Sequence, residues 1–351
     1  MLKVLFVSTT GRLNRPYFDP SVRYRCFNIA EELSKNGNYC RVTTSDNFIN
    51  KDMDEFDVYV FHRPPFSPNF INKVQLLQEQ GKVVIADYDD LIFDVENALN
   101  SSLYKTGRAT QREVLNIFSK NAAALSVFNN YTVSTTSLAN RLKELSPTSN
   151  VMVIHNSLTE KYKSICDQIR LNEPIERVKG RFGYFSGTKS HDKDIEYIST
   201  ALVESCNFDT GREILFVGPV DIPGIVSENC KTITNPLVGY HEMIKLLCSC
   251  EVIIAPLENS FFNNCKSGLK YFESAYSGCN VVGTPITDIR RFDSENLYFA
   301  ETLEEWSVAL NNAASDFSTQ NLESRLSDAA SQADIKNEIA NWNSFVQQLL
   351  G

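Results

Sequence analysis

The sequence predicts an α/β protein with two parallel sheets. Short apolar runs alternate with amphipathic helical segments along the 351 residues, which is typical of strands joined by crossover helices. A chain of this length with 42% hydrophobic residues can form two cores, and a polar stretch near its middle separates two such series. We therefore predict two tandem Rossmann-like domains with an interdomain cleft.

The first series occupies residues 1–160, the expected N-terminal domain. Its apolar runs predict strands at 3–9, 40–45, 57–63, 82–88, 131–136 and 151–157. Helical patterns between them predict helices at about 22–36, 69–80, 109–128 and 137–145. The first of these helices ends at Lys35-Asn36-Gly37, a common helix stop signal.

The second series occupies 181–332, after a polar stretch at 161–180 that we interpret as a linker because the periodicity fades there. Its strands are predicted at 181–187, 213–219, 230–235, 251–257 and 280–285. Its helices are predicted near 192–205, 240–249 and 267–276. The last segment, 333–351, predicts a C-terminal helix with Trp342 on its apolar side, which we expect to cross back to the N-terminal domain.

Charge argues against a nucleic-acid partner. The net charge is −9, and residues 1–170 hold 20 basic and 18 acidic side chains against 14 and 25 in residues 171–351. Nucleic acid binding requires a strongly basic face, and no stretch provides one. No apolar run approaches the roughly 20 residues of a membrane span. The mildly basic first half is compatible with peripheral contact with an anionic membrane surface.

Two observations indicate a reducing cytoplasmic setting. The chain has nine cysteines, an odd number, and its opening "MLKVLFVSTT" lacks the pattern of a signal peptide. Cys248 and Cys250 raise the alternatives of a zinc site or buried thiols. No CxxC partner or nearby histidine completes a zinc set, so buried thiols are favoured.

The segment "NNCKSGLKYFESAYSGCNVVGTP" (263–285) holds the clearest candidate site, because ligands of parallel sheets bind beyond the carboxyl ends of strands. Lys266 starts the predicted helix, where its ammonium and free backbone N–H groups would form an anion site suited to a diphosphate. Glu273 lies seven residues on, two turns along the same face, and its carboxylate suits a ribose diol. The alternative is a surface helix with a solvated lysine and glutamate.

Gly187 follows the first strand of the second series, where a glycine permits close approach of a phosphate or sugar. Ser190 and Asp192 nearby are equally suited to helix capping. The four histidines form no triad. His62 and His155 follow strands, and each is expected either in the core or as a supporting residue behind a site. His191 is the histidine that we expect to face the cleft.

Asp87, Asp89 and Asp90 cluster at a strand end. They fit three roles: an Asp-x-Asp metal site, binding of sugar hydroxyls, or structural ion pairs. The metal role is the least favoured, because a helix terminus and a lysine already provide for a diphosphate. The arginines expected nearby are Arg23, Arg25 and Arg63.

Segment 263–285 resembles the donor-binding segment of GT-B glycosyltransferases, in particular retaining family 4 and its bacterial surface-polysaccharide branch, with the pattern KS-x-LK-x-x-E-x-x-x-x-G-x-x-VV. "PSVRYR", "YDDLIFD", "YTVSTTSLA" and "GYFSGTKSHDKD" resemble that branch at corresponding places. The resemblance implies a UDP- or GDP-linked sugar donor in the C-terminal domain and an acceptor in the N-terminal domain. It also implies retention of configuration without a metal or other cofactor.

By this resemblance Lys266 would bind the donor diphosphate and Glu273 the ribose. Further donor-binding residues would be Gly187, Thr188, Asn263, Asn264 and Ser267. The candidate catalytic residues are Lys266, Asp87, Asp89, Asp90 and His191. Arg23 and Arg25 are expected to face the acceptor or the cleft.

One departure concerns catalysis. Many family members carry two glutamates in an E-x7-E pattern, and the first falls at Cys265 here. Asn263 and Asn264 could bind the sugar hydroxyls in its place, or an aspartate of 87–90 could stabilise the cationic centre.

The sequence therefore predicts transfer of a hexose to a growing, lipid-linked bacterial glycan, an O antigen or capsule polysaccharide. Two rival functions remain open. One is a nucleotide-sugar epimerase on the same fold. The other is a non-catalytic glycan- or nucleotide-binding subunit.

Overall fold

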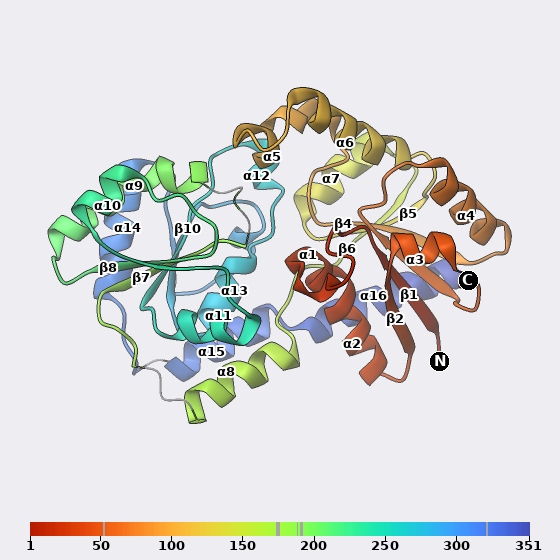
Figure 1. The fold of residues 1–351 in the computed structure, drawn as a ribbon. Coiled ribbons are helices and arrows are strands. Elements are labelled where there is room, and N and C mark those ends of the chain that lie inside the picture. Colours follow the sequence, from red (N-terminus) through yellow and green to blue (C-terminus); the bar gives the residue numbers. More distant parts are fainter. Residues whose placement is uncertain (52, 173–175, 188, 190–191, 321) are drawn as a thin grey trace. The chain divides into compact units, whose positions relative to one another are not determined.

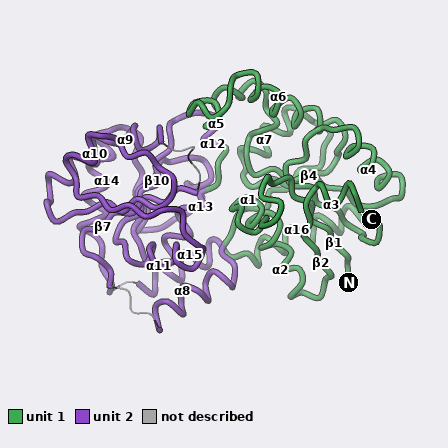
Figure 2. Tube along the Cα trace, viewed as in Figure 1, with its two compact units in different colours: residues 1–157, 265–267, 334–351 green, residues 158–264, 268–333 purple. Residues whose placement is uncertain are grey.

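The chain forms two compact units in the computed structural model, which describes all residues except 52, 173–175, 188, 190–191 and 321. Figure 2 colours the two units. The first unit comprises residues 1–157, 265–267 and 334–351, and the second comprises 158–264 and 268–333. Each contains one six-stranded sheet in which every strand pairing is parallel, so the predicted α/β class with two parallel sheets is confirmed.

The sheet of the first unit has the strand order β2-β1-β3-β4-β5-β6 (Figure 1). All six predicted strands are present, each within a few residues of its expected bounds. Strands β3 and β4 are buried along their whole length, as near-continuous apolar runs in parallel sheets are. The strands are β1 (Lys3–Ser8), β2 (Tyr39–Thr44), β3 (Val58–His62), β4 (Val83–Tyr88), β5 (Asn130–Val133) and β6 (Asn150–Val153).

Three of the four helices predicted in the first unit, those at about 69–80, 109–128 and 137–145, are present as continuous helices. The longest of those between strands, α6, begins with a reciprocal capping box between Thr110 and Glu113, which satisfies two backbone N–H groups of its first turn. The main helices are α2 (Asn28–Lys35), α3 (Ser45–Asn50), α4 (Pro68–Glu79), α6 (Gln111–Ala124), α7 (Thr136–Leu145) and α16 (Ile335–Leu350). The short ones are η1 (Pro16–Phe18), α1 (Pro20–Val22), η3 (Val95–Asn100) and α5 (Ser102–Lys105).

The C-terminal helix α16 packs into the core of the first unit. Trp342 is 1% exposed and lies in one apolar cluster with residues of β1, β3 and β4, including Val4, Val60 and Ile85. Burial of one side of an amphipathic helix against a sheet explains why its apolar residues recur at helical spacing.

The helix expected at 22–36 is interrupted. After α1 comes a π-helical segment, Arg23–Phe27, and α2 begins only at Asn28. The widened turn directs Arg23, Tyr24, Arg25 and Cys26 into the interior, where all four are buried. The apolar spacing of this stretch is compatible with either helix type, so the sequence did not reveal the interruption.

The sheet of the second unit has the order β12-β11-β10-β7-β8-β9. Five of its strands were predicted, and the short edge strand β12 was not. Gly218, after β8, has φ +96°, and a Cβ there would lie 1.9 Å from the Ser186 carbonyl, so only glycine fits. The strands are β7 (Arg181–Phe185), β8 (Glu213–Val217), β9 (Lys231–Asn235), β10 (Val252–Ala255), β11 (Asn280–Gly283) and β12 (Leu297–Phe299).

Helix α8 (Glu160–Asn172) covers much of the polar stretch 161–180, where the sequence had predicted no helix. Its buried residues Tyr162, Cys166 and Ile169 recur at helical spacing, but the polar residues between them mask the pattern. The other helices are α9 (Asp192–Phe208), α10 (Gly224–Asn229), α11 (Tyr240–Cys248), α12 (Phe261–Asn264), α13 (Leu269–Tyr276), η4 (Ile289–Arg291), α14 (Leu303–Ser315) and α15 (Leu322–Gln332).

Candidate functional site

Each sheet has one point at which the strand order reverses direction. In the first unit it lies between β1 and β3, and in the second between β7 and β10. Ligands of open parallel sheets bind outside the carboxyl ends of the strands at this point, because the two following loops diverge there. The candidate residues are therefore those in the loops after these four strands and in the helices that follow them.

The carboxylate of Asp87 forms a buried ion pair with Arg25. Arg25 Nε and Nη2 donate to the two Asp87 oxygens at 3.0 and 2.6 Å, and the two side chains are 0% and 2% exposed. Thr132 Oγ1 donates to the same carboxylate at 2.7 Å, and Arg25 Nη1 also donates to Asn156 Oδ1 and to the Ile154 carbonyl. Of the three roles considered for the acidic cluster, this geometry supports the structural one for Asp87.

Asp89 belongs to a different network, next to the β1/β3 reversal. His62 Nε2 lies 3.1 Å from Asp89 Oδ1, and Arg63 Nε donates to that same oxygen at 2.6 Å. Ser21 Oγ donates to the other Asp89 oxygen and lies 3.1 Å from His62 Nε2. The network thus joins the end of β3, the loop after β4 and the helical turn after β1.

Electrostatics favour the charged form of Asp89. Burial alone would raise its pKa, but the charge of Arg63 and the contacts with His62 outweigh burial and hold the pKa of Asp89 well below its usual range. A carboxylate anchored in this way is preorganised to accept hydrogen bonds from a ligand.

Arg63 has an unusual backbone. Its φ of +50° is the one positive value among the described non-glycine residues. Thr9 Oγ1 donates to the carbonyls of His62 and Arg63 at 3.1 Å each, and the Arg63 N–H donates to the Asp87 carbonyl at 2.8 Å. Backbone strain of this kind is concentrated at functional sites, so this turn strengthens the assignment of a site to the β1/β3 reversal.

Two other predicted residues of the first unit, Asp90 and Arg23, lie outside the hydrogen-bonded network around Asp89. Asp90 is partly exposed, 3.9 Å from Arg63 Nη2, and its side chain accepts from the N–H of Leu91. The Arg23 guanidinium lies 5.8 and 5.9 Å from the ring centroids of Tyr17 and Tyr24.

His62 is buried, as expected, at 2% exposed, and it supports the Asp89 carboxylate through the contact of its Nε2. Its Nδ1 has no hydrogen-bond partner among the described residues. The sequence signal for this role was the position of His62 at the end of a predicted strand, directly before Arg63.

In the second unit, Asn263 and Asn264 follow β10 and hold their loop in place. Asn263 is 6% exposed, and its Nδ2 donates to the Glu258 carbonyl at 2.9 Å. Asn264 Oδ1 accepts from the N–H of Thr287 at 2.8 Å and from its hydroxyl at 3.1 Å. Both amides therefore have internal partners.

The start of α13 differs from the prediction. The helix begins at Leu269 and not at 267, so Lys266 precedes it and the argument that Lys266 and Glu273 share a helix face does not hold. The N–H of Gly268 is also not free, since it donates to Asp288 Oδ2 at 2.7 Å. Gly268 packs against the backbone of Ile289, because a Cβ at position 268 would lie only 3.1 Å from the Ile289 Cα atom. The helix therefore starts two residues later than predicted.

Cys265, Lys266 and Ser267 group with the first unit by their contacts. The Cys265 carbonyl accepts a hydrogen bond from Thr135 Oγ1 at 2.9 Å. Cys265 is fully buried, and burial together with the charges of Asp90 and Asp94 raises the pKa of its thiol to about 12. The thiol is therefore neutral and does not replace a catalytic carboxylate.

The remaining predicted donor residues are described only in part. Glu273 is partly buried on α13, and its carbonyl accepts from the Tyr162 hydroxyl at 2.8 Å. Gly187 lies exposed in the turn after β7. Thr188 and His191 lie outside the described residues. Ser267 Oγ is buried and has no hydrogen-bond partner within the described part of the chain.

The cysteines are free thiols, and all except the half-buried Cys40 are buried. Burial raises the pKa of Cys248 to about 11, and the pKa of Cys250 is raised as well. Among the described residues no group of three or more His, Cys, Asp or Glu side chains is arranged to hold a metal ion.

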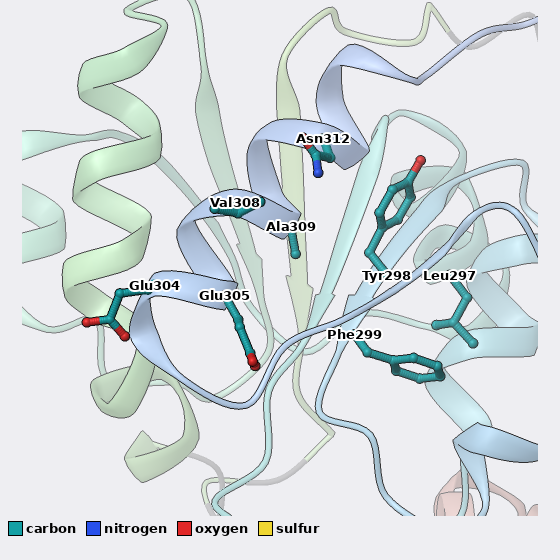
Figure 3. Close-up of a pocket in the computed structure, with 8 residues that line it drawn as sticks. All are labelled: Leu297, Tyr298, Phe299, Glu304, Glu305, Val308, Ala309 and Asn312. Atoms are coloured by element: carbon teal, nitrogen blue, oxygen red, sulfur yellow. The ribbon is translucent and has the colours of Figure 1, made fainter.

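A groove of about 500 Å³ lies elsewhere on the second unit, between the edge strand β12 and helix α14 (Figure 3). Phe299 and Tyr298 line the strand side, and Val308 and Ala309 line the helix side. The groove belongs to the sheet edge and not to the β7/β10 reversal, so we do not assign the candidate site to it. In the described part of the chain, no helix is both long and apolar enough to cross a bilayer.

No protein-family model and no curated protein sequence matches the chain. Solved structures match it over its full length. HepE from Anabaena, solved with UDP and glucose, has a TM-score of 0.64 at 10% identity, covering 99% of this chain and 100% of HepE. Sucrose-phosphate synthase from Thermosynechococcus elongatus has a TM-score of 0.64 at 11% identity, covering 99% of both chains. AviGT4, a glycosyltransferase involved in avilamycin A biosynthesis, has a TM-score of 0.61 at 12% identity, covering 100% of this chain and 98% of AviGT4.

At these identities the similarity establishes the fold. Two parallel six-stranded sheets in tandem, matched from end to end, are the arrangement of glycosyltransferases of the GT-B class. The chain therefore has the GT-B fold.

Proposed function

We propose that this chain is a glycosyltransferase that moves a hexose from a UDP- or GDP-linked donor to a growing glycan, with retention of configuration and without a metal. The acceptor that we propose is a lipid-linked bacterial O antigen or capsule polysaccharide, reached at the cytoplasmic face of the membrane by peripheral contact. The family 4 and polysaccharide assignments rest on the resemblance of segment 263–285.

The observation that carries the proposal is the full-length similarity to HepE, which has been solved with UDP, with UDP and glucose, and with UDP-glucose. Similar folds in AviGT4 and in sucrose-phosphate synthase support glycosyl transfer as the reaction class. The reversal point β7/β10 supports a nucleotide site in the second unit, because nucleotides bind at this position in sheets of this strand order.

We assign the donor to Gly187, Thr188, Asn264 and Glu273, with Lys266 and Ser267 next to its diphosphate. Lys266 would stabilise the negative charge that develops on the leaving diphosphate as the sugar becomes cationic. The buried hydroxyl of Ser267, which has no hydrogen-bond partner among the residues that the structure describes, supports a ligand-binding role for this segment.

We assign the acceptor to the first unit, at the network of Asp89, His62, Arg63 and Ser21. Its carboxylate and guanidinium groups together can accept and donate hydrogen bonds to sugar hydroxyls. Asp90 lies at its partly exposed edge. Asp87 and Arg25 are buried against each other and take a structural role in this proposal.

Calorimetric binding of UDP, GDP, ADP and CMP, in the presence of EDTA, tests the nucleotide site. We expect one of the diphosphates to bind the wild type and to bind Lys266→Ala much more weakly. Turnover of Lys266→Ala should fall at least a hundredfold, since loss of one such donor to a developing anion costs on the order of 2.7–4 kcal/mol.

The matched control is Lys179→Ala, an exposed lysine just before β7, which should behave as wild type. Turnover of Lys266→Ala within fivefold of wild type would contradict its role. A strict requirement for Mn²⁺ or Mg²⁺ would contradict the metal-free mechanism.

A second candidate function is favoured by one observation. The neutral, buried thiol of Cys265 stands where many family members have a carboxylate, which is compatible with a binding subunit that has lost its chemistry. Nucleotide-sugar binding without transfer or slow hydrolysis would support this alternative. Conversion of the free sugar nucleotide without any acceptor would instead indicate an epimerase.

A further inference from the structure

The positive charge of the first half of the chain is concentrated in one segment. The other residues of 1–170 hold 16 basic and 17 acidic side chains, so without this segment the half is close to neutral. Residues 171–351, with 14 basic and 25 acidic side chains, are strongly acidic. The segment is 101–124, and it holds four basic side chains, Lys105, Arg108, Arg112 and Lys120, and one acidic side chain, Glu113.

This segment forms α5, a turn and α6, which are drawn at the top of Figure 1. Helix α6 packs on the first unit through one side, where Val114 and Phe118 are buried. Arg112 and Lys120 lie on the outward side of the helix and are exposed, as is Arg108 in the turn before it. We call these three cations the basic face.

The charge of the basic face is not neutralised within the unit. No ion pair joins its three cations to any residue that the structure describes. The carboxylate of Glu113 accepts from the N–H and the hydroxyl of Thr110 at 2.8 Å each. The segment η3 packs against α6, and its Glu96 and the preceding Asp94 pair with Arg141 at 2.6 and 2.8 Å. The acidic side chains nearest to the basic face in these elements therefore have other partners.

Exposed apolar side chains accompany the cations. Ile117 on α6 is 39% exposed. Phe66 is 38% exposed and adjoins the end of α6, because its N–H donates to the Lys120 carbonyl at 2.8 Å. Cations next to apolar side chains suit a lipid surface, where the cations contact phosphate groups and the apolar groups reach the acyl boundary. Charge complementarity therefore favours an anionic lipid surface as the partner.

We propose that the basic face of α6 docks the first unit on a membrane surface that contains anionic phospholipids. This inference rests on the proposed function and deepens it, because it names the segment that makes the peripheral contact through which a lipid-linked acceptor is reached.

Co-sedimentation with vesicles tests the proposal. Wild type should bind vesicles of phosphatidylcholine with roughly 30% phosphatidylglycerol at least tenfold more tightly than vesicles of phosphatidylcholine alone. Binding should weaken between about 0.1 and 0.5 M NaCl, because salt screens the attraction. Arg112→Gln/Lys120→Gln should weaken binding to the anionic vesicles at least tenfold, since each basic side chain near such a surface contributes about fivefold. The matched control is Lys3→Gln/Arg41→Gln, which removes the same charges from exposed positions of β1 and β2 and should bind within twofold of wild type.

Binding of Arg112→Gln/Lys120→Gln to anionic vesicles within twofold of wild type would overturn the inference. Failure of the wild type to prefer the anionic vesicles would overturn it as well. Calorimetry with UDP and GDP separates this outcome from the proposed function. If the wild type binds one of these nucleotides and the double variant still sediments with anionic vesicles, the inference fails and the proposed function stands.

The opposite outcome is also distinguishable. If the wild type binds neither nucleotide while vesicle binding depends on the two cations, the proposed function fails and the membrane contact stands. The double variant should bind the nucleotide as wild type does, because neither side chain belongs to the proposed donor or acceptor site. Should circular dichroism show that the double variant does not fold, Arg108→Gln/Arg112→Gln provides the same comparison.

Discussion

Replacement of Arg25 by methionine should destabilise the first unit strongly. Methionine keeps much of the apolar stem but removes the guanidinium that pairs with Asp87 in the core. The carboxylate then stays buried with Thr132 Oγ1 as its remaining partner from the present network. Isolating one member of a buried ion pair in this way typically costs about 3–5 kcal/mol.

The structure supports the upper part of that range. Arg25 loses two bonds to Asp87, one to Asn156 and one to the Ile154 carbonyl. Lys120, an exposed lysine on α6, provides a control in the same unit. Lys120→Met should cost less than about 1 kcal/mol.

Tryptophan fluorescence can report on the first unit alone. The sequence has two tryptophans, Trp342 in the core of the first unit and Trp306 in the core of the second. In a Trp306→Phe background, urea unfolding followed through Trp342 measures the first unit without assuming that the whole chain unfolds in one step. A loss of 4 kcal/mol should lower the urea midpoint by roughly 2 M.

The result that would refute this reasoning is a cost below 1 kcal/mol for Arg25→Met. The double variant Arg25→Met/Asp87→Leu gives an independent check, because removing both charges should restore part of the lost stability. A double variant less stable than Arg25→Met would show that the destabilisation comes from packing and not from an isolated charge.

Two further predictions follow from the pKa shifts and the burial of single residues. Because the pKa of Asp89 is lowered in the folded state, its contribution to stability is present above its ordinary value of 3.8 and is lost as the pH falls below that value. Asp89→Asn should therefore be less stable than wild type at pH 7, and the difference in urea midpoint should shrink below about pH 4; a constant difference would contradict the shift. Native protein should react with one equivalent of a thiol reagent such as DTNB, at the half-buried Cys40, and Cys40→Ser should abolish this reaction; fast labelling of a second thiol would contradict the burial of the other cysteines.

The alternation of apolar runs and amphipathic segments predicted both sheets because parallel strands are buried on both faces. Strands β3 and β4 are mostly apolar, with only His62 and Asp87 as strongly polar exceptions near their ends, and were located within two residues. The edge strand β12 was missed because it has three residues, all at least partly exposed, and therefore no continuous apolar run. Helix α8 was missed for a related reason, since only three of its residues are buried.

The candidate residues were harder to assign than the elements that carry them. The cluster of Asp87, Asp89 and Asp90 was visible, but its division into a structural pair and a hydrogen-bonded network depends on which side of the strand each residue faces. Asp87 is in register with His62 of β3 and Thr132 of β5, whereas Asp89 comes after the strand has ended. The partner of Asp87 lies 62 residues away on a π-helical turn that no sequence pattern indicated.

The displaced start of α13 shows why the spacing of two residues does not by itself define a binding site. Lys266 and Glu273 would lie two turns apart on one face if both were helical, but Gly268 packs on Ile289 and gives its N–H to Asp288, so the helix begins after Lys266. Lys270 and Glu273, by contrast, are three residues apart within the helix and are neighbours on its surface.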